Sequence, residues 1–124
     1  MKQEEKNLLL QDLCSRLPYG VIIEHEGTLS KLDTIFMCDS ISISSTSMDN
    51  GLSYNLDLDE VKPCLYPLSS MTEEQIKEYK HLVAFGGSSN GAANFTDWLN
   101  KNHFDYRGLI PMGLAINATG LNIY

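Results

Sequence analysis

The residue types that could carry chemistry are concentrated in one stretch of the chain, residues 95–110. It holds the only tryptophan, two of the four phenylalanines and one of the three histidines. Four of its side chains are our candidate binding residues: Trp98, His103, Tyr106 and Arg107. If an aromatic ring is exposed beside Arg107, the two would form the kind of hot spot that protein interfaces favour. Aromatic residues at helical spacing also build cores, so both interpretations stay open.

Other patterns that could support catalysis or cofactor binding are incomplete. The three histidines lack the spacing of metal ligands, and the three cysteines contain no C-x-x-C pair. Residues 57–60 lack the glycine and the distal glutamate of a calcium loop, and the glycine-rich stretch 86–94 lacks the Lys-Ser/Thr of a phosphate-binding loop. We expect a surface position for His25 and buried free thiols at Cys14, Cys38 and Cys64. We therefore assign no catalytic residue, no metal site and no cofactor.

Composition and charge narrow the class of protein further. The chain has 124 residues, of which 43% are hydrophobic and 20% charged, as expected of a single globular domain, 1–124. Its net charge of −7 argues against direct nucleic-acid binding, and Arg107 would be alone on a DNA-reading helix. The acids between residues 33 and 60 are Asp33, Asp39, Asp49, Asp57, Asp59 and Glu60, with no Lys or Arg among them. Without a signal peptide or a membrane span, we expect a cytoplasmic protein with no membrane partner.

The first half of the chain predicts one helix followed by a small sheet. Residues 7–17 place Leu9, Leu13 and Cys14 on one apolar stripe and Asp12 and Arg16 opposite, and Pro18 ends the helix. Five strands follow, at 19–25, 29–37, 40–45, 52–56 and 61–66, with a bulge in the second. Short strands joined by tight turns favour an antiparallel, partly open SH3-like barrel over residues 19–66. A flat meander covered by helices is the alternative.

The second half, residues 72–113, predicts two or three short helices. Thr72 and Gln75 form a capping box at the start of the first. We expect a flexible loop over 86–94, a helix over 96–103, and a short fourth helix over 106–112 that Asp105 caps. A last strand at 114–116 and a trailing end at 117–124 complete an α+β domain.

Three blocks of sequence carry a resemblance to a known family. They are Leu-Cys-Ser-Arg-Leu-Pro-Tyr-Gly-Val-Ile (13–22), Val-Lys-Pro-Cys-Leu-Tyr-Pro-Leu-Ser-Ser-Met-Thr-Glu-Glu (61–74) and Asp-Trp-Leu-Asn-Lys-Asn-His-Phe-Asp-Tyr-Arg-Gly-Leu-Ile-Pro-Met-Gly-Leu-Ala (97–115). In these blocks the chain resembles small uncharacterised proteins of Bacteroides-type gut bacteria, their prophages and their phages. The resemblance implies a biological setting and no chemistry.

Three functional hypotheses follow. The first is a non-catalytic protein-binding or adaptor domain of a phage or mobile element, which would bind a host or phage protein through a sheet edge or the 98–107 corner. The second is an acidic charge mimic that blocks a host nucleic-acid-binding protein, and it requires the acids of 33–60 to form one face. The third is an enzyme of unknown class, and it requires a pocket where a Cys, a His or a pair of carboxylates converges.

Overall fold

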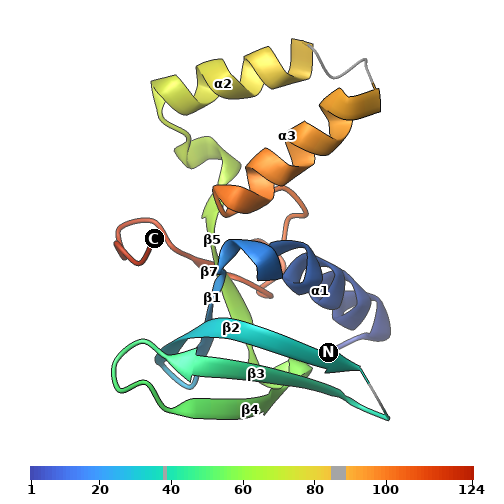
Figure 1. Cartoon of the computed structure of the whole chain (residues 1–124), viewed down its shortest axis with the longest axis vertical. Helices are drawn as coiled ribbons and strands as arrows, with labels where there is room; N and C mark the ends of the chain where they lie inside the picture. The colour runs from blue at the N-terminus through green and yellow to red at the C-terminus, as the bar shows by residue number, and fades with distance from the viewer. Residues whose placement is uncertain (38, 85–88) are drawn as a thin grey trace.

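The computed structural model describes residues 1–37, 39–84 and 89–124 and shows an elongated α+β arrangement (Figure 1). The helices are α1 (Gln3–Arg16), α2 (Glu73–Ala84) and α3 (Ser89–Lys101). The strands are β1 (Ile22–His25), β2 (Thr28–Met37), β3 (Ile41–Ser47), β4 (Ser53–Asp57), β5 (Lys62–Pro67), β6 (Phe104–Asp105) and β7 (Ile116–Asn117). Three 3₁₀ turns, η1 (Leu17–Tyr19), η2 (Leu58–Glu60) and η3 (Leu68–Ser70), connect them. The α2–α3 pair lies at one end of the long axis and β2–β4 at the other.

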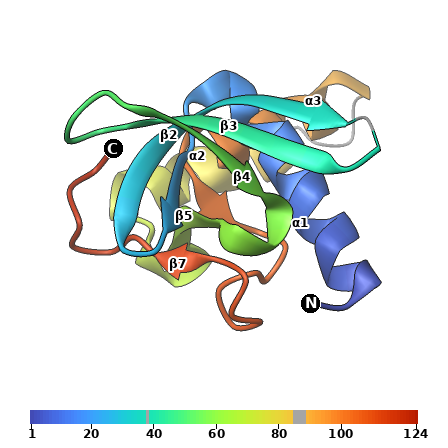
Figure 2. The same ribbon diagram turned by 90° about the horizontal axis from the view of Figure 1, so that it is seen from below.

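The strands form one open sheet in the order β4-β3-β2-β1-β5-β6, with β7 also paired to β5. The first five are antiparallel, as predicted, whereas β6 and β7 each run parallel to β5. The expected sheet of five strands is therefore too small. Two-residue strands carry no periodic pattern, so only the tertiary pairing with β5 identifies them. Figure 2 shows β2, β3 and β4 as a layer in front of the helices.

The register places small polar residues on both faces of β3. A bulge interrupts β2 between Leu32 and Thr34, as predicted. Ile43 points into the core together with Ser45 and Ser47, whereas the alternate residues 42, 44 and 46 lie on the opposite face, away from the core.

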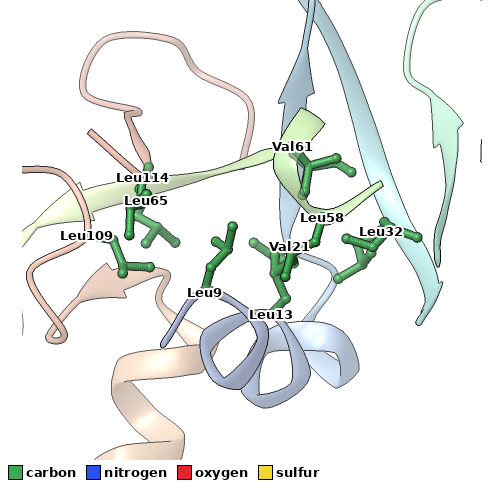
Figure 3. Packing of buried hydrophobic residues seen from close by; sticks show 12 residues of the cluster. Leu9, Leu13, Val21, Leu32, Leu58, Val61, Leu65, Leu109 and Leu114 are labelled. Atoms are coloured by element: carbon green, nitrogen blue, oxygen red, sulfur yellow. The ribbon is translucent and has the colours of Figure 1, made fainter. Parts of the chain in front are cut away.

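The core forms where α1 packs across the sheet (Figure 3). Leu9 and Leu13 of α1 are fully buried, as predicted, and each contributes about 1.5–3 kcal/mol to folding. Around them lie residues from β2, β5 and η2, from the positions just before β1 and β5, and from the segment before β7, namely Val21, Leu32, Leu58, Val61, Leu65, Leu109 and Leu114.

The stripe of α1 that faces the core differs from the predicted one. Cys14 is exposed, whereas Asp12 and Arg16 are fully buried. The reason is geometric, because residues 9, 12, 13 and 16 follow the three-and-four spacing of one helix face. The prediction put Asp12 and Arg16 on the outer side because it assigned only apolar residues to the face that packs on the sheet.

The C-terminal half corrects several predictions. The capping box is present, since the backbone N–H of Gln75 donates to Thr72 Oγ1 at 3.2 Å and that of Thr72 to Gln75 Oε1 at 2.9 Å. The predicted loop over 86–94 is wrong for residues 89–94, which belong to α3, and residues 86–88 lie outside the described part. The ring of Tyr79 on α2 contacts that of Phe95 on α3 at 5.2 Å between centroids, and this packing supports the longer helix.

The predicted fourth helix over 106–112 is a series of turns. Gly108, with φ +77°, takes a left-handed conformation that ends any helix there. Asp105 does act as a cap, because its carboxylate accepts the backbone N–H groups of Leu109 and Ile110, both at 2.9 Å. The prediction that Asp105 is a cap is therefore confirmed, but the turn that it caps does not continue into a helix.

The segment 117–124 does not trail away. The Tyr124 hydroxyl accepts the backbone N–H of Ile22 at 2.8 Å and donates to the carbonyl of Cys64 at 2.7 Å. The pairing of β1 with β5 includes Ile23 opposite Pro63, and Ile22 and Cys64 come next in that register. Tyr124 thus bridges the two strands where their direct pairing stops.

Candidate functional site

The four predicted binding residues lie in two different environments. Trp98 is on α3 and faces α2, whereas His103, Tyr106 and Arg107 lie on the segment that leads past β6 toward α1. The predicted corner is therefore not one surface. Three of its members contact residues far away in the sequence.

Asp12 is the centre of a buried ion network formed by Asp12, Arg16 and Arg107. Its Oδ2 accepts Arg16 Nε at 2.9 Å, and its Oδ1 accepts Arg107 Nη1 at 2.7 Å. Arg107 also donates to Ser15 Oγ at 3.1 Å. Two guanidinium groups share one carboxylate, and Arg16 is fully buried while the Arg107 side chain is 12% exposed. Loss of the carboxylate would therefore leave one buried and one largely buried cation uncompensated.

Tyr106 fills the space between the two arginines. Its ring centroid lies 4.4 Å from the guanidinium carbon of Arg107 and 5.4 Å from that of Arg16, within the range of cation–π attraction. Its hydroxyl donates to Asn100 Oδ1 at 3.0 Å, and Arg16 Nη2 donates to the carbonyl of Phe104 at 2.6 Å. Tyr106 and Arg107 therefore hold the chain after β6 against α1, which is a structural role.

His103 lies at the end of α3 with φ +62° and is only 8% exposed. Its ring stacks on Tyr124, with 3.6 Å between centroids, and its Nδ1 has no hydrogen-bond partner among the described residues. Burial, and secondarily the charge of Arg16, lower the pKa of His103 to about 4. The imidazole is neutral at neutral pH and is enclosed rather than offered to a partner.

Trp98 is the predicted residue that reaches a hollow on the surface. Its Nε1 donates to Glu78 Oε2 at 2.9 Å, and its ring stacks on Phe104 with 5.7 Å between centroids. Trp98 also lines an open hollow of about 500 Å³ between α2 and α3. The other residues that line it are Lys77, Glu78, His81 and Leu82. We call it the α2–α3 groove.

The potential catalytic residues are in unfavourable environments. Burial, and secondarily Glu24, raise the pKa of the Cys64 thiol to about 11, so it stays protonated. His25, expected at the surface, is buried against Tyr54 with 4.8 Å between ring centroids, and its Nε2 lies 3.4 Å from Ser30 Oγ. Cys38 lies outside the described residues. No group of three metal-ligating side chains occurs in the parts of the chain that the structure describes.

The acids of 33–60 are exposed but do not gather in one place. Asp39, Asp57 and Asp59 line one hollow near the start of α1. Asp33 accepts a hydrogen bond from Thr46 along the sheet, and Asp49 lies in the turn at the far end of β3. Three of the six acids thus share one hollow, and the charge mimic, which requires all six on one face, stays a prediction.

Sequence reasoning missed Asp12, Arg16 and Tyr124. Asp12 and Arg16 carried a usable signal, because opposite charges four residues apart lie on the same line as Leu9 and Leu13. Tyr124 carried none, since its partners Ile22 and Cys64 are 102 and 60 residues away.

No family model, curated protein or solved structure matches this chain. Among the helices described, none is long and apolar enough to cross a membrane.

Proposed function

We propose that this chain is a non-catalytic protein-binding domain, and that the α2–α3 groove receives an amphipathic segment of the partner protein. The observation that carries this proposal is that α2 has no fully buried residue, although its sequence is amphipathic. Leu82 and Trp98 line the groove, and Ile76 and Val83, on a different side of α2, remain 39% and 50% exposed. Monomeric proteins seldom leave such a helix uncovered without an interaction partner.

The charges of the groove indicate the chemistry of the partner. The carboxylate of Glu78 already accepts the indole N–H of Trp98. Lys77 is exposed and makes no ion pair with the residues that the structure describes. A segment that inserts a large apolar side chain beside Trp98 and places a carboxylate near Lys77 would complement both features.

The family resemblance supports a phage or bacterial-host protein as the partner. We also interpret β1–β5 as the SH3-like barrel expected from the sequence. Their order, β4-β3-β2-β1-β5, and the 3₁₀ turn η2 between β4 and β5 support that interpretation. In this proposal the barrel carries α1 and β6, which in turn contact α3 and so hold the groove.

The test is a capture experiment with a charge-reversed variant and a matched control. Wild type, Lys77→Glu and Lys80→Glu would be immobilised and exposed to lysate of phage-infected host cells. Both lysines are exposed on α2, but Lys77 lines the groove and Lys80 does not. A true partner is retained by wild type and Lys80→Glu and is weakened at least about tenfold, or 1.4 kcal/mol, by Lys77→Glu.

The single tryptophan provides an independent readout, because Trp98 fluorescence must change when the purified partner fills the groove. If no captured protein distinguishes Lys77→Glu from Lys80→Glu, the proposal is wrong. It is equally wrong if a captured protein binds without changing the emission of Trp98.

A further inference from the structure

The face of the sheet that points away from α1 has an unusual composition. In the β2–β3–β4 register, Phe36 lies opposite Ser42, and Ser44 lies between Thr34 and Asn55. Directly paired residues project to the same side, so hydroxyl and amide groups cover this face. The exceptions are Asp57, which lies opposite Ser42, Lys31, which lies opposite Thr46, and Phe36, a large aromatic residue with 52% of its surface exposed.

This face is hollowed beside Phe36. A depression of about 430 Å³ is lined by Phe36, Asp39, Ser40, Ser42 and Asn55. It shares Asp39 and Ser40 with a second depression of about 410 Å³, whose other lining residues are Gln3, Lys6, Ile41, Asp57, Leu58 and Asp59. Together they form a groove, here the sheet groove, that leads from the outer face of the sheet to the start of α1.

Several polar groups of the sheet groove are available to a ligand. The side chains of Asp39, Ser42 and Asn55 make no hydrogen bond to any residue described by the structure. The other two carboxylates are already engaged. That of Asp57 accepts the backbone N–H of Glu60, and that of Asp59 lies 3.5 Å from Lys6 Nζ. The groove thus offers one free carboxylate, several neutral donors and acceptors, and one aromatic ring.

We propose that the sheet groove binds a neutral carbohydrate chain. The flat apolar face of a sugar ring, made of C–H groups, matches the exposed ring of Phe36. Hydroxyl groups at its edge match Asp39, which accepts hydrogen bonds, and Asn55, which both donates and accepts them. The second depression has room for further sugar units toward Gln3 and Lys6.

A basic peptide is the competing ligand, because the groove contains three carboxylates. Among the three, Asp59 is paired with Lys6 and Asp57 already accepts a backbone N–H, so Asp39 is the carboxylate left free to accept a new hydrogen bond. An exposed phenylalanine beside one free carboxylate, two serine hydroxyls and an amide fits a ring with hydroxyl substituents.

The test is a titration of the ¹⁵N-labelled chain with cellohexaose, mannohexaose and chitohexaose, followed by amide chemical shifts. Sorbitol, which has hydroxyls but no ring, is the control ligand. We expect at least one hexasaccharide, and not sorbitol, to shift the amides of 36–42 and 53–57. Phe36→Ala should weaken that binding about three- to tenfold, and Phe36→Tyr should preserve it.

Two further variants locate the site. Asn55→Ala should weaken binding about fivefold through lost hydrogen bonds, whereas Met48→Ala should leave it unchanged. Met48 is also exposed, but it lies beyond the opposite end of β3. The proposal is overturned if none of the three hexasaccharides binds, or if the Phe36 and Met48 variants behave alike. It is overturned too if a peptide of alternating Arg and Ser shifts these amides and the sugars do not.

Discussion

The helices α1 and α2 contradict what their sequences suggest about burial. The sequence of α1 carries charges along the face that packs on the sheet, and Asp12 and Arg16 there are fully buried. The sequence of α2 has a complete capping box and an apolar face, yet none of its residues is fully buried.

The difference between the two helices lies in their partners. The helix α1 packs against several strands and against the segment that carries Arg107, so even its charged residues find compensation inside. The helix α2 packs mainly on α3. Local signals therefore specify that a helix forms, whereas the number of surrounding elements determines how much of it is buried.

The largest effect should come from removing the charge at the centre of α1. Asp12→Ala leaves Arg16 and Arg107 without their shared carboxylate, and we expect a loss of about 3–5 kcal/mol in the free energy of unfolding. Urea denaturation measures it. The adjacent exposed Gln11→Ala should change stability by less than about 0.5 kcal/mol. If Asp12→Ala and Gln11→Ala changed the free energy of unfolding equally, α1 would contain no essential buried charge. Its contrast with the weakly buried α2 would then be lost.

An intermediate effect should appear as a pH dependence near α1. In the unfolded chain His103 takes up a proton near pH 6.5, but in the folded protein only near pH 4, since burial and Arg16 lower its pKa. Between these values the unfolded state binds more protons, so stability decreases as the pH falls from about 6.5 to about 4. The loss from this group is up to about 3 kcal/mol, and it makes no contribution above that window.

His103→Asn tests this assignment, because Asn tolerates the left-handed backbone at this position. The variant should be less stable than wild type at neutral pH but should show a flatter dependence between pH 4 and 6.5. Urea midpoints measured across that range would give the result. A variant with an unchanged slope would assign the pH dependence to other groups.

The smallest effect should come from α2. Thr72→Ala removes the side-chain acceptor of the capping box and should cost about 1 kcal/mol. Because α2 packs mainly on α3, we expect this loss as a local opening. Amide hydrogen exchange in α2 should become about fivefold faster, with little change in the global urea midpoint. Ser69→Ala is the exposed control, and a large shift of the global midpoint in Thr72→Ala would show that α2 is more tightly coupled.

The sequence predicted what depends on neighbours along the chain. Alternation placed β1 to β5 within a few residues of their positions, and the pair Thr72 and Gln75 identified the start of α2. It did not predict β6, and it placed the last strand at 114–116, whereas β7 is Ile116–Asn117. Both strands exist because β5 is beside them. For the four candidate binding residues, the residue types indicated that they could bind a partner. The sequence did not indicate which of them would be exposed and which would be engaged inside the protein. Trp98 reaches a groove, whereas Tyr106 and Arg107 are engaged by residues more than eighty positions earlier.

The bridge formed by Tyr124 has a consequence for the order of folding. Its two hydrogen bonds close loops of 102 and 60 residues, and contacts of such long sequence separation form late because the loop-closure entropy must first be offset. The hairpins of β1 to β4 need only short loops and can form earlier. The end of the β1–β5 pairing is therefore one of the last features of the sheet to be fixed, and there a single hydroxyl group takes the place of direct backbone pairing.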